Sequence, residues 1–287
     1  MPPSTPPLTV RRRRLGTELR RLRERADLSA TEAAARIGIT QSRVSNIEAG
    51  RYGVSADRVR AFARSYDCSD QVLIDALAAM TGERKRGWWE EYRGILPPAL
   101  LDLAEIEHHA TSLRGAYVAH LPGLLQTPEH ARAIFRQAVP AFSPPEVEHR
   151  VSHRIKRQVV LHQERPTPYT AIIHEAALRM GFGGASTTLG QLRHILEMSE
   201  HEHVTVLVIP FAAGDFPGSG QSVLYAHGAV KQLDAVHLDT EVGSTLLDSE
   251  AKLERYRVVL DRMEDVALRE KLSRDLIHRI VQSLEGE

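Results

Sequence analysis

Residues 40–48, TQSRVSNIE, carry a row of polar side chains that could contact DNA bases. Val44 and Ile47 lie three positions apart, so a helix over this segment would bury both on one face. The other face would present the polar residues Gln41, Ser42, Arg43 and Asn46. Gln and Asn can each form paired hydrogen bonds with adenine, and Arg can do so with guanine. This face therefore has the chemistry needed to read bases in the major groove.

A second set of residues is suited to contacts with DNA phosphates. Such contacts hold a protein on the duplex without reading its sequence. The residues that we expect in this role are Thr31, Thr40, Ser45 and Arg51, with Arg36 as a weaker candidate.

Helical spacing of apolar residues over 15–80 predicts the elements that position these side chains. The pattern indicates five short helices. Residues suited to capping or ending helices punctuate it at Ser29, Glu32, Gly38, Gly50 and Ser55. Two short helices joined through Gly38 and Ile39 match a helix-turn-helix, in which the second helix reads the groove. We predict an all-α five-helix DNA-binding domain over 15–80.

Residues 15–77 also resemble the XRE-type (lambda repressor-like) DNA-binding domain. The resemblance is carried by LGTELRRLRERADLSATEAAARIGITQSRVSNIEAGRYGVSADRVRAFARSYD. It implies base contacts by the set named above and a structural role for Glu48. It also implies a homodimer on a double-stranded DNA operator with paired half-sites. One departure is Ala30, because many members have Gln there as a phosphate contact, which Thr31 or Ser29 would have to replace.

Charge is divided unevenly along the chain, although its 37 basic and 37 acidic residues cancel. Residues 1–66 hold 14 Arg and 6 acidic residues, a balance of +8, which leaves −8 for the remainder. This asymmetry indicates a polyanion-binding module joined to one that does not bind polyanions. Residues 1–14, rich in Pro and ending in four Arg, are expected to be a flexible basic tail.

Beyond residue 80 the pattern mixes helices and strands. Residues 81–110 are predicted to form a helical connector, and 111–284 an α+β (mixed α/β) domain. Strands are expected at 113–120, 169–174, 204–210, 221–227 and 234–240. Helices are expected at 127–138, 144–163, 186–200, 249–263 and 267–284. The last three strands are close in sequence, which suggests a meander.

Three segments of this second domain resemble the C-terminal domain of a large actinomycete family of XRE-type regulators that includes the WhiJ-like proteins. They are YVAHLPGLLQTPEHARAIF, HEAALR and VTVLVIPFAAGDFPGSG. Genes of that family often neighbour a gene for a small companion protein, so the resemblance implies a protein partner. A small-molecule effector is the other interpretation of this domain, and an enzyme fused to a DNA-binding domain is the least favoured.

Residues with metal-binding or catalytic chemistry form no convincing set in the sequence. All 14 histidines follow residue 107, and the pairs His149/His153 and His201/His203 lack an acidic third ligand at a recognisable spacing. A Ser/His/Asp site could combine Ser219 or Ser222 with His227 and Asp234 or Asp239, but no nucleophile-elbow pattern precedes either serine. We therefore expect no metal, no cofactor and no catalytic residues.

The cellular setting is predicted from cysteine content and hydropathy. The single cysteine, Cys68, excludes an intramolecular disulfide and fits a reducing cytoplasm. No apolar run approaches the roughly 18 residues needed to cross a bilayer, so no membrane association is expected. Together these features predict a cytoplasmic, sequence-specific transcriptional regulator controlled through its C-terminal domain by a small protein partner or ligand. The alternative is an antitoxin-like protein that neutralises its companion and autoregulates its operon.

Overall fold

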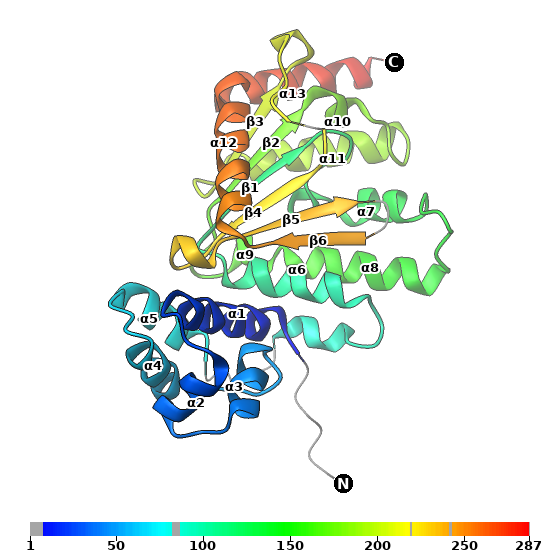
Figure 1. The fold of residues 1–287 in the computed structure, drawn as a ribbon. Helices are drawn as coiled ribbons and strands as arrows, with labels where there is room; N and C mark the ends of the chain where they lie inside the picture. Colours follow the sequence, from blue (N-terminus) through cyan, green and yellow to red (C-terminus); the bar gives the residue numbers. More distant parts are fainter. Residues whose placement is uncertain (1–7, 82–86, 219, 241–242, 287) are drawn as a thin grey trace. The chain divides into compact units, whose positions relative to one another are not determined.

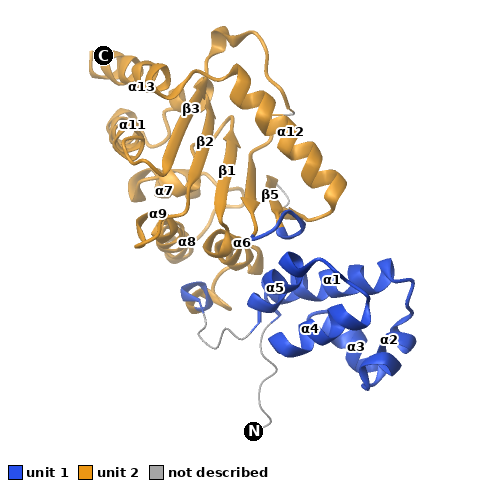
Figure 2. Cartoon of the chain, turned by 90° about the vertical axis from the view of Figure 1, so that its left-hand side faces the viewer, with its two compact units in different colours: residues 1–90, 229–233 blue, residues 91–228, 234–287 orange. Residues whose placement is uncertain are grey.

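The computed structural model describes residues 8–81, 87–218, 220–240 and 243–286. The chain divides into two compact units, which Figure 2 shows in different colours. Unit 1 comprises Met1–Glu90 with Ala229–Leu233, and unit 2 comprises Glu91–Gly228 with Asp234–Glu287. Residues 1–7 of the predicted tail and 82–86 of the predicted connector lie outside the described residues.

Unit 1 is helical. Its described α-helices are α1 (Val10–Arg25), α2 (Ala30–Ile37), α3 (Gln41–Glu48), α4 (Ala56–Ser65) and α5 (Gln71–Ala79). Ser29 and Glu32 form the predicted capping box of α2, and Gly38 ends that helix in the left-handed conformation with φ 73°. Ser55 caps α4 by accepting a hydrogen bond from the Arg58 N–H. The all-α prediction for this part of the chain is confirmed.

The predicted tail over 1–14 extends too far, because α1 begins at Val10. Thr9 caps this helix by accepting a hydrogen bond from the Arg12 N–H, and the Val10 side chain is only 5% exposed. Capping and burial together place Arg11 to Arg14 in the first turns of a helix. These four arginines therefore have fixed backbone positions.

Unit 2 is built on a six-stranded sheet with the strand order β3-β2-β1-β4-β5-β6 (Figure 1). The strands are β1 (Ser112–Tyr117), β2 (Tyr169–His174), β3 (Val204–Ile209), β4 (Val223–His227), β5 (Ala235–Thr240) and β6 (Gly243–Leu247). β1, β2 and β3 pair in parallel, whereas β4, β5 and β6 pair antiparallel, β4 also against β1. β1 is therefore the boundary between a parallel half and an antiparallel half.

Helices cover both faces of this sheet. One face packs mainly against α6 (Pro98–His109), α9 (Val159–His162), α11 (Ala185–Met198) and α13 (Glu270–Glu285). α7 (Pro128–Phe135) and α8 (Pro144–Arg157) pack against each other, α7 beside α11 and α8 beside α6 and α9. The other face packs against α12 (Glu250–Val266), which Figure 1 shows running across the strands. Alternation along β2 explains this arrangement, since Ala171 and Ile173 join the first core and Ile172 joins the second. The α+β prediction is confirmed.

Two features of the sheet differ from the predicted meander. The strand predicted at 204–210 is β3, which pairs with β2 at the far edge of the sheet and not with β4. The meander consists of β4, β5 and β6. β6 was not predicted, because its sequence GSTLL lacks apolar alternation and most of its side chains are exposed or half-buried at the sheet edge.

The predicted helical connector is only partly helical. It contains the 3-10 helix η1 (Trp88–Tyr92) and then α6, which starts at Pro98. Proline is favoured in the first turn of a helix, so the Pro97-Pro98 pair begins α6. The predicted helix 144–163 is likewise interrupted at Gln158, between α8 and α9. Short elements complete the fold: α10 (Glu175–Arg179), η2 (Gly123–Leu125), η3 (Phe211–Ala213) and η4 (Lys231–Leu233).

Candidate nucleic-acid interface

α3 is held in place by the close approach of α1. A Cβ atom on Gly16 would lie 2.3 Å from the Glu48 carbonyl oxygen and 2.6 Å from that of Ile47. Both distances are shorter than any van der Waals contact, so only glycine allows the two backbones to be this close. On the same side of α3, Val44 is fully buried and Ile47 is 2% exposed.

A buried ion pair ties the end of α3 to α1. Arg23 Nε donates to Glu48 Oε1 at 2.7 Å, and Nη2 donates to Oε2 at 2.9 Å. Arg23 Nη1 also donates to the Leu28 carbonyl at 2.7 Å, and these bonds to Glu48 raise the pKa of Arg23. Planar bidentate pairing fixes orientation as well as distance. Glu48 therefore has the structural role that the resemblance implied.

The predicted base-reading residues lie on the opposite face of α3. Gln41, Ser42 and Arg43 are exposed, and Asn46 is half-buried. Gln41 Nε2 donates to Ser45 Oγ at 3.0 Å, and Asn46 Nδ2 donates to the Ser42 carbonyl at 2.9 Å. These bonds lie within one exposed helix face, where a base edge can replace them. The Arg43 guanidinium makes no hydrogen bond or ion pair with any residue that the structure describes.

The predicted phosphate contacts fall into two groups. Thr40 caps α3, Ser45 bonds to Gln41, and the exposed Arg51 lies 3.4 Å from Asn46 Oδ1 through Nη1. These residues border the predicted base-reading face. Thr31 is exposed in the first turn of α2, which precedes α3 in the helix-turn-helix.

Arg36 is placed differently from the other candidates. Its Nη1 donates to the Ser65 carbonyl at 2.9 Å, near the end of α4, and lies 3.5 Å from Asp67. The guanidinium thus already caps a helix C-terminus, where cations are stabilised by the helix dipole.

Two further residues beside α3 were not among the predicted set. Tyr52 is 52% exposed, and its N–H donates to the Asn46 carbonyl at 3.2 Å. Arg12 Nη2 donates to the Arg51 carbonyl at 3.1 Å. A tyrosine hydroxyl and a guanidinium both suit phosphate oxygens. Their signal in the sequence is position alone, because Tyr52 follows Arg51 and Arg12 belongs to the basic run before α1.

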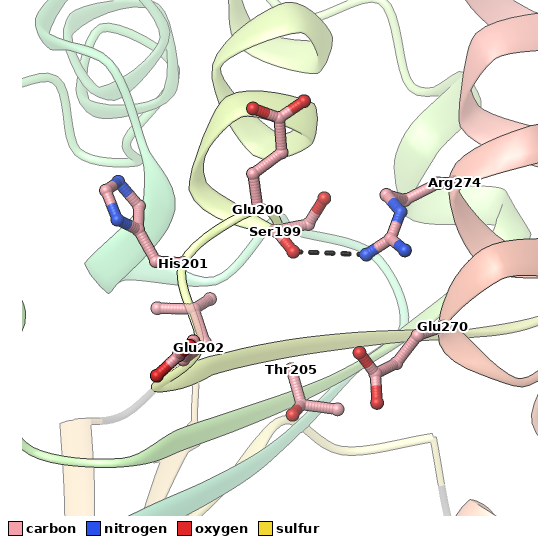
Figure 3. A pocket seen from close by; sticks show the side chains of 8 residues that line it. Ser199, Glu200, His201, Glu202, Thr205, Glu270 and Arg274 are labelled. Carbon is pink, nitrogen blue, oxygen red and sulfur yellow. Dashed lines mark hydrogen bonds between the residues drawn. The ribbon is translucent and has the colours of Figure 1, made fainter.

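Two cavities of unit 2 are lined by described residues. The first, of about 430 Å³, lies at the amino end of β3 and is lined by Glu200, Glu202 and Glu270 among other residues (Figure 3). Its three carboxylates are spread around the opening, as Figure 3 shows. Its one lining arginine, Arg274, already donates to the Ser199 carbonyl at 3.2 Å. This cavity therefore lacks converging groups.

The second cavity, of about 140 Å³, lies at the carboxyl end of β1. Its lining includes the polar side chains of Tyr117, Gln126, Arg154, Arg157 and His237. Basic groups and hydrogen-bond donors thus converge here, in contrast to the first cavity.

The structure brings no metal-binding or catalytic set together among the described residues that the sequence offered as candidates. Asp234 accepts hydrogen bonds from the Tyr225 hydroxyl at 2.6 Å and the Gly228 N–H at 2.9 Å, which is a structural role. No group of three or more His, Cys, Asp or Glu in the described ranges is placed to hold a metal ion. Within the same ranges, no helix has the length and apolar character needed to span a bilayer.

Two family models match the chain. One, described as a helix-turn-helix domain, matches residues 14–77, a range that includes α2, α3 and α4 and most of α1 and α5. This match indicates a DNA-binding regulator. The other, described as a domain of unknown function (DUF5753), matches residues 100–279. No curated protein and no solved structure matches. Because the second model covers more than half of the 287 residues, the chain belongs to the DUF5753 family, with a helix-turn-helix domain before that domain.

Proposed function

We propose that the protein is a sequence-specific transcriptional regulator in which α3 reads the major groove through Gln41, Ser42, Arg43 and Asn46. The observation that carries the proposal is the division of α3 into two faces. Val44, Ile47 and Glu48 are buried against the rest of unit 1, while the unpaired Arg43 guanidinium is exposed beside two amide side chains. A rigidly held helix with exposed paired donors and acceptors suits direct readout.

Phosphate contacts flank this reading face. Thr40, Ser45 and Arg51 border α3, and Thr31 begins the preceding helix. Tyr52 and Arg12 extend the set, whereas Arg36 would first have to leave the Ser65 carbonyl. Such contacts would position the helix without selecting a sequence.

The regulator is proposed to act as a homodimer in the cytoplasm. Helix-turn-helix domains of this kind bind paired half-sites about one helical turn apart. The WhiJ-like resemblance supports membership of that actinomycete group and a small companion protein, as in an antitoxin-like pair. The cavity at the end of β1 supports the alternative control by a small-molecule effector. In both cases unit 2 controls binding without catalysis.

The base-reading assignment is tested by selecting bound fragments from genomic DNA and then measuring variants on the selected operator and on random DNA. Arg43→Ala and Gln41→Ala should each cost about 1–3 kcal/mol on the operator, at one base position each. Arg51→Ala, the matched control, should weaken both DNAs alike and reduce the salt dependence. Equal losses on both DNAs for Arg43→Ala would refute base reading.

A further inference from the structure

The smaller cavity of unit 2 lies where strand pairing in the sheet changes from parallel to antiparallel. Ala116 near the end of β1 pairs with Val223 at the start of β4, which pairs with Leu238 near the end of β5. β1 is parallel to β2 on its other side. The chain leaves β1 toward β2 and later returns to the opposite side of β1 as β4. In open α/β sheets, ligands bind outside the carboxyl ends of strands at such switch points.

Arg154 on α8 supplies a positive charge to this cavity. Its Nη1 donates to Gln126 Oε1 at 2.8 Å, and its guanidinium carbon lies 4.3 Å from the centre of the Phe135 ring. Its Nε is shielded from solvent and has no hydrogen-bond partner among the described residues. Among the described residues, no acidic side chain forms an ion pair with Arg154. The half-buried Arg154 guanidinium therefore lacks an anionic partner, which is costly for a partly desolvated charge, and an anionic ligand would supply that partner.

His237 on β5 adds a second unsatisfied group. The side chain is only 7% exposed, and its Nε2 has no hydrogen-bond partner among the described residues. His237 lines the same cavity as Arg154. Buried polar atoms are normally hydrogen-bonded, so an unpaired one beside a cavity marks a place where a ligand or water can bond.

The remaining charges leave the Arg154 charge uncompensated. Arg157 forms a bidentate pair with the fully buried Glu107, so these two charges cancel. Asp239 also lines the cavity, but its side chain is 71% exposed and lies 3.9 Å from His237 Nδ1, at the rim. Burial and the neighbouring Arg157 lower the pKa of Arg154 to about 10, which still leaves it charged at neutral pH.

The groups around Arg154 are also held rigidly. Gln126, which orients the guanidinium, donates through its side-chain Nε2 to the Leu121 carbonyl at 2.7 Å. The backbone carbonyl of Gln126 accepts a hydrogen bond from Gln158 Nε2 at 2.6 Å. Gly123 lies beside both arginines, since a Cβ there would be in van der Waals contact with them, 3.8 Å from Arg154 Nε and 3.6 Å from Arg157 Nη1. Pre-organisation of this kind reduces the cost of binding.

We propose that this cavity binds the carboxylate or phosphate group of a small organic anion, through Arg154 and the Nε2 atom of His237. Its volume of about 140 Å³ is below the roughly 300–1,000 Å³ of pockets for drug-sized ligands, so it accepts a small molecule or the anionic head of a larger one. The role of this anion as an effector rests on the proposed function, whereas its binding does not.

The test titrates the full-length protein, without DNA, with inorganic phosphate in one series and acetate or succinate in another, at constant ionic strength set with chloride. The expected result is a saturable change in the His237 imidazole NMR signals and a rise in Tm with at least one probe. The phosphate and carboxylate arms then distinguish the two head groups. No saturable change with any probe would overturn the proposal.

Variants assign the binding to Arg154. Arg154→Gln should raise the Kd about 10- to 100-fold, because it removes charged hydrogen bonds, and Arg154→Lys should weaken binding less. Arg193→Gln is the matched control, since Arg193 is exposed on α11 and pairs with Glu285. Unchanged binding in a folded Arg154→Gln protein would contradict the site. If that variant does not fold, the wild-type His237 titration decides the question.

Operator binding measured on the same preparation separates the two proposals. Intact operator binding with no anion binding would overturn the anion-site proposal and leave the proposed function standing. Saturable anion binding without sequence-specific DNA binding would support the anion site and overturn the proposed function.

Discussion

Each unit of the protein contains a buried bidentate Arg–Glu pair, and the two pairs support different kinds of surface. In unit 1, Arg23 and Glu48 join α1 to the end of α3, with side chains 10% and 6% exposed. In unit 2, Arg157 and Glu107 join α8 to α6, with side chains 8% and 0% exposed. Nε and Nη2 of each arginine bond the two oxygens of its partner.

The two units differ in where the arginine without an ion-pair partner lies. In unit 1, the unpaired Arg43 guanidinium is exposed on the outside of α3, where a long polyanion can reach it. Next to the second pair, the Arg154 guanidinium is enclosed at a cavity that only a small group can enter. A buried Arg–Glu pair thus supports an outward-facing surface in unit 1 and an inward-facing site in unit 2.

Removing one partner of each pair should give the largest effects and should separate the two units. Glu48→Ala and Glu107→Ala each remove the carboxylate that a buried guanidinium bonds in a bidentate pair, which costs about 3–5 kcal/mol in the free energy of unfolding. Peptide-resolved hydrogen exchange should show faster exchange in α1 and α3 for the first variant, and in α6 and α8 for the second. The exposed pair Arg193–Glu285 provides the control, so Glu285→Gln should leave both patterns unchanged. Faster exchange throughout both units in either variant would contradict this separation.

A smaller loss is expected where two backbones meet in unit 1. Gly16→Ala places a methyl group 2.3 Å from the Glu48 carbonyl oxygen, so α1 and α3 must separate. We expect the free energy of unfolding to fall by about 1–3 kcal/mol, measured by urea denaturation. Gly190→Ala in the exposed part of α11 is the control, because a Cβ there meets nothing within 4 Å. It should stabilise the protein by about 0.4–1 kcal/mol, and equal behaviour of both variants would rule out the close contact.

The stability of the two units should also depend differently on pH. Burial and neighbouring arginines lower the pKa of His130 to about 4 and of His153 to about 3. The unfolded chain, with His pKa values near 6.5, binds more protons, so stability is lost as pH falls below about 6.5 toward these values. Between pH 7 and pH 5 each of these two histidines should cost unit 2 on the order of 1–2 kcal/mol, whereas the sequence of unit 1 contains no histidine.

Hydrogen exchange of each unit across this range measures that effect. His153→Gln should flatten the pH dependence of unit 2. A parallel loss in unit 1 over the same window, or no change in His153→Gln, would show that these histidines are not the cause.

The helix-turn-helix could be predicted from sequence because its signals are local. The spacing of Val44 and Ile47 and the caps at Ser29, Gly38 and Ser55 depend only on neighbours in the chain. The close approach at Gly16 was missed, since it depends on which helix crosses above that residue. The two-faced character of α3 follows from the same local pattern.

The cavity in unit 2 could not be predicted in this way. In the sequence, Arg154 is one of several basic residues of an amphipathic helix, a pattern typical of a solvated face. Only the pairing of β1 with β4, across more than a hundred residues of chain, brings His237 and Gln126 to the same place. β3 was wrongly placed in the meander for a related reason, because its pairing with β2 is long-range and is not set by sequence proximity to β4.

The central claim, that the exposed face of α3 selects the DNA sequence, is tested most directly by replacing Gln41, Ser42, Arg43 and Asn46 with alanine in one protein. The measurement is the ratio of affinities for the selected operator and for random DNA, at fixed salt concentration. The account predicts that this ratio falls at least 100-fold, toward one, because several base contacts of about 1–3 kcal/mol each are lost together. Binding to random DNA should change by only a few-fold. An unchanged ratio would contradict the account.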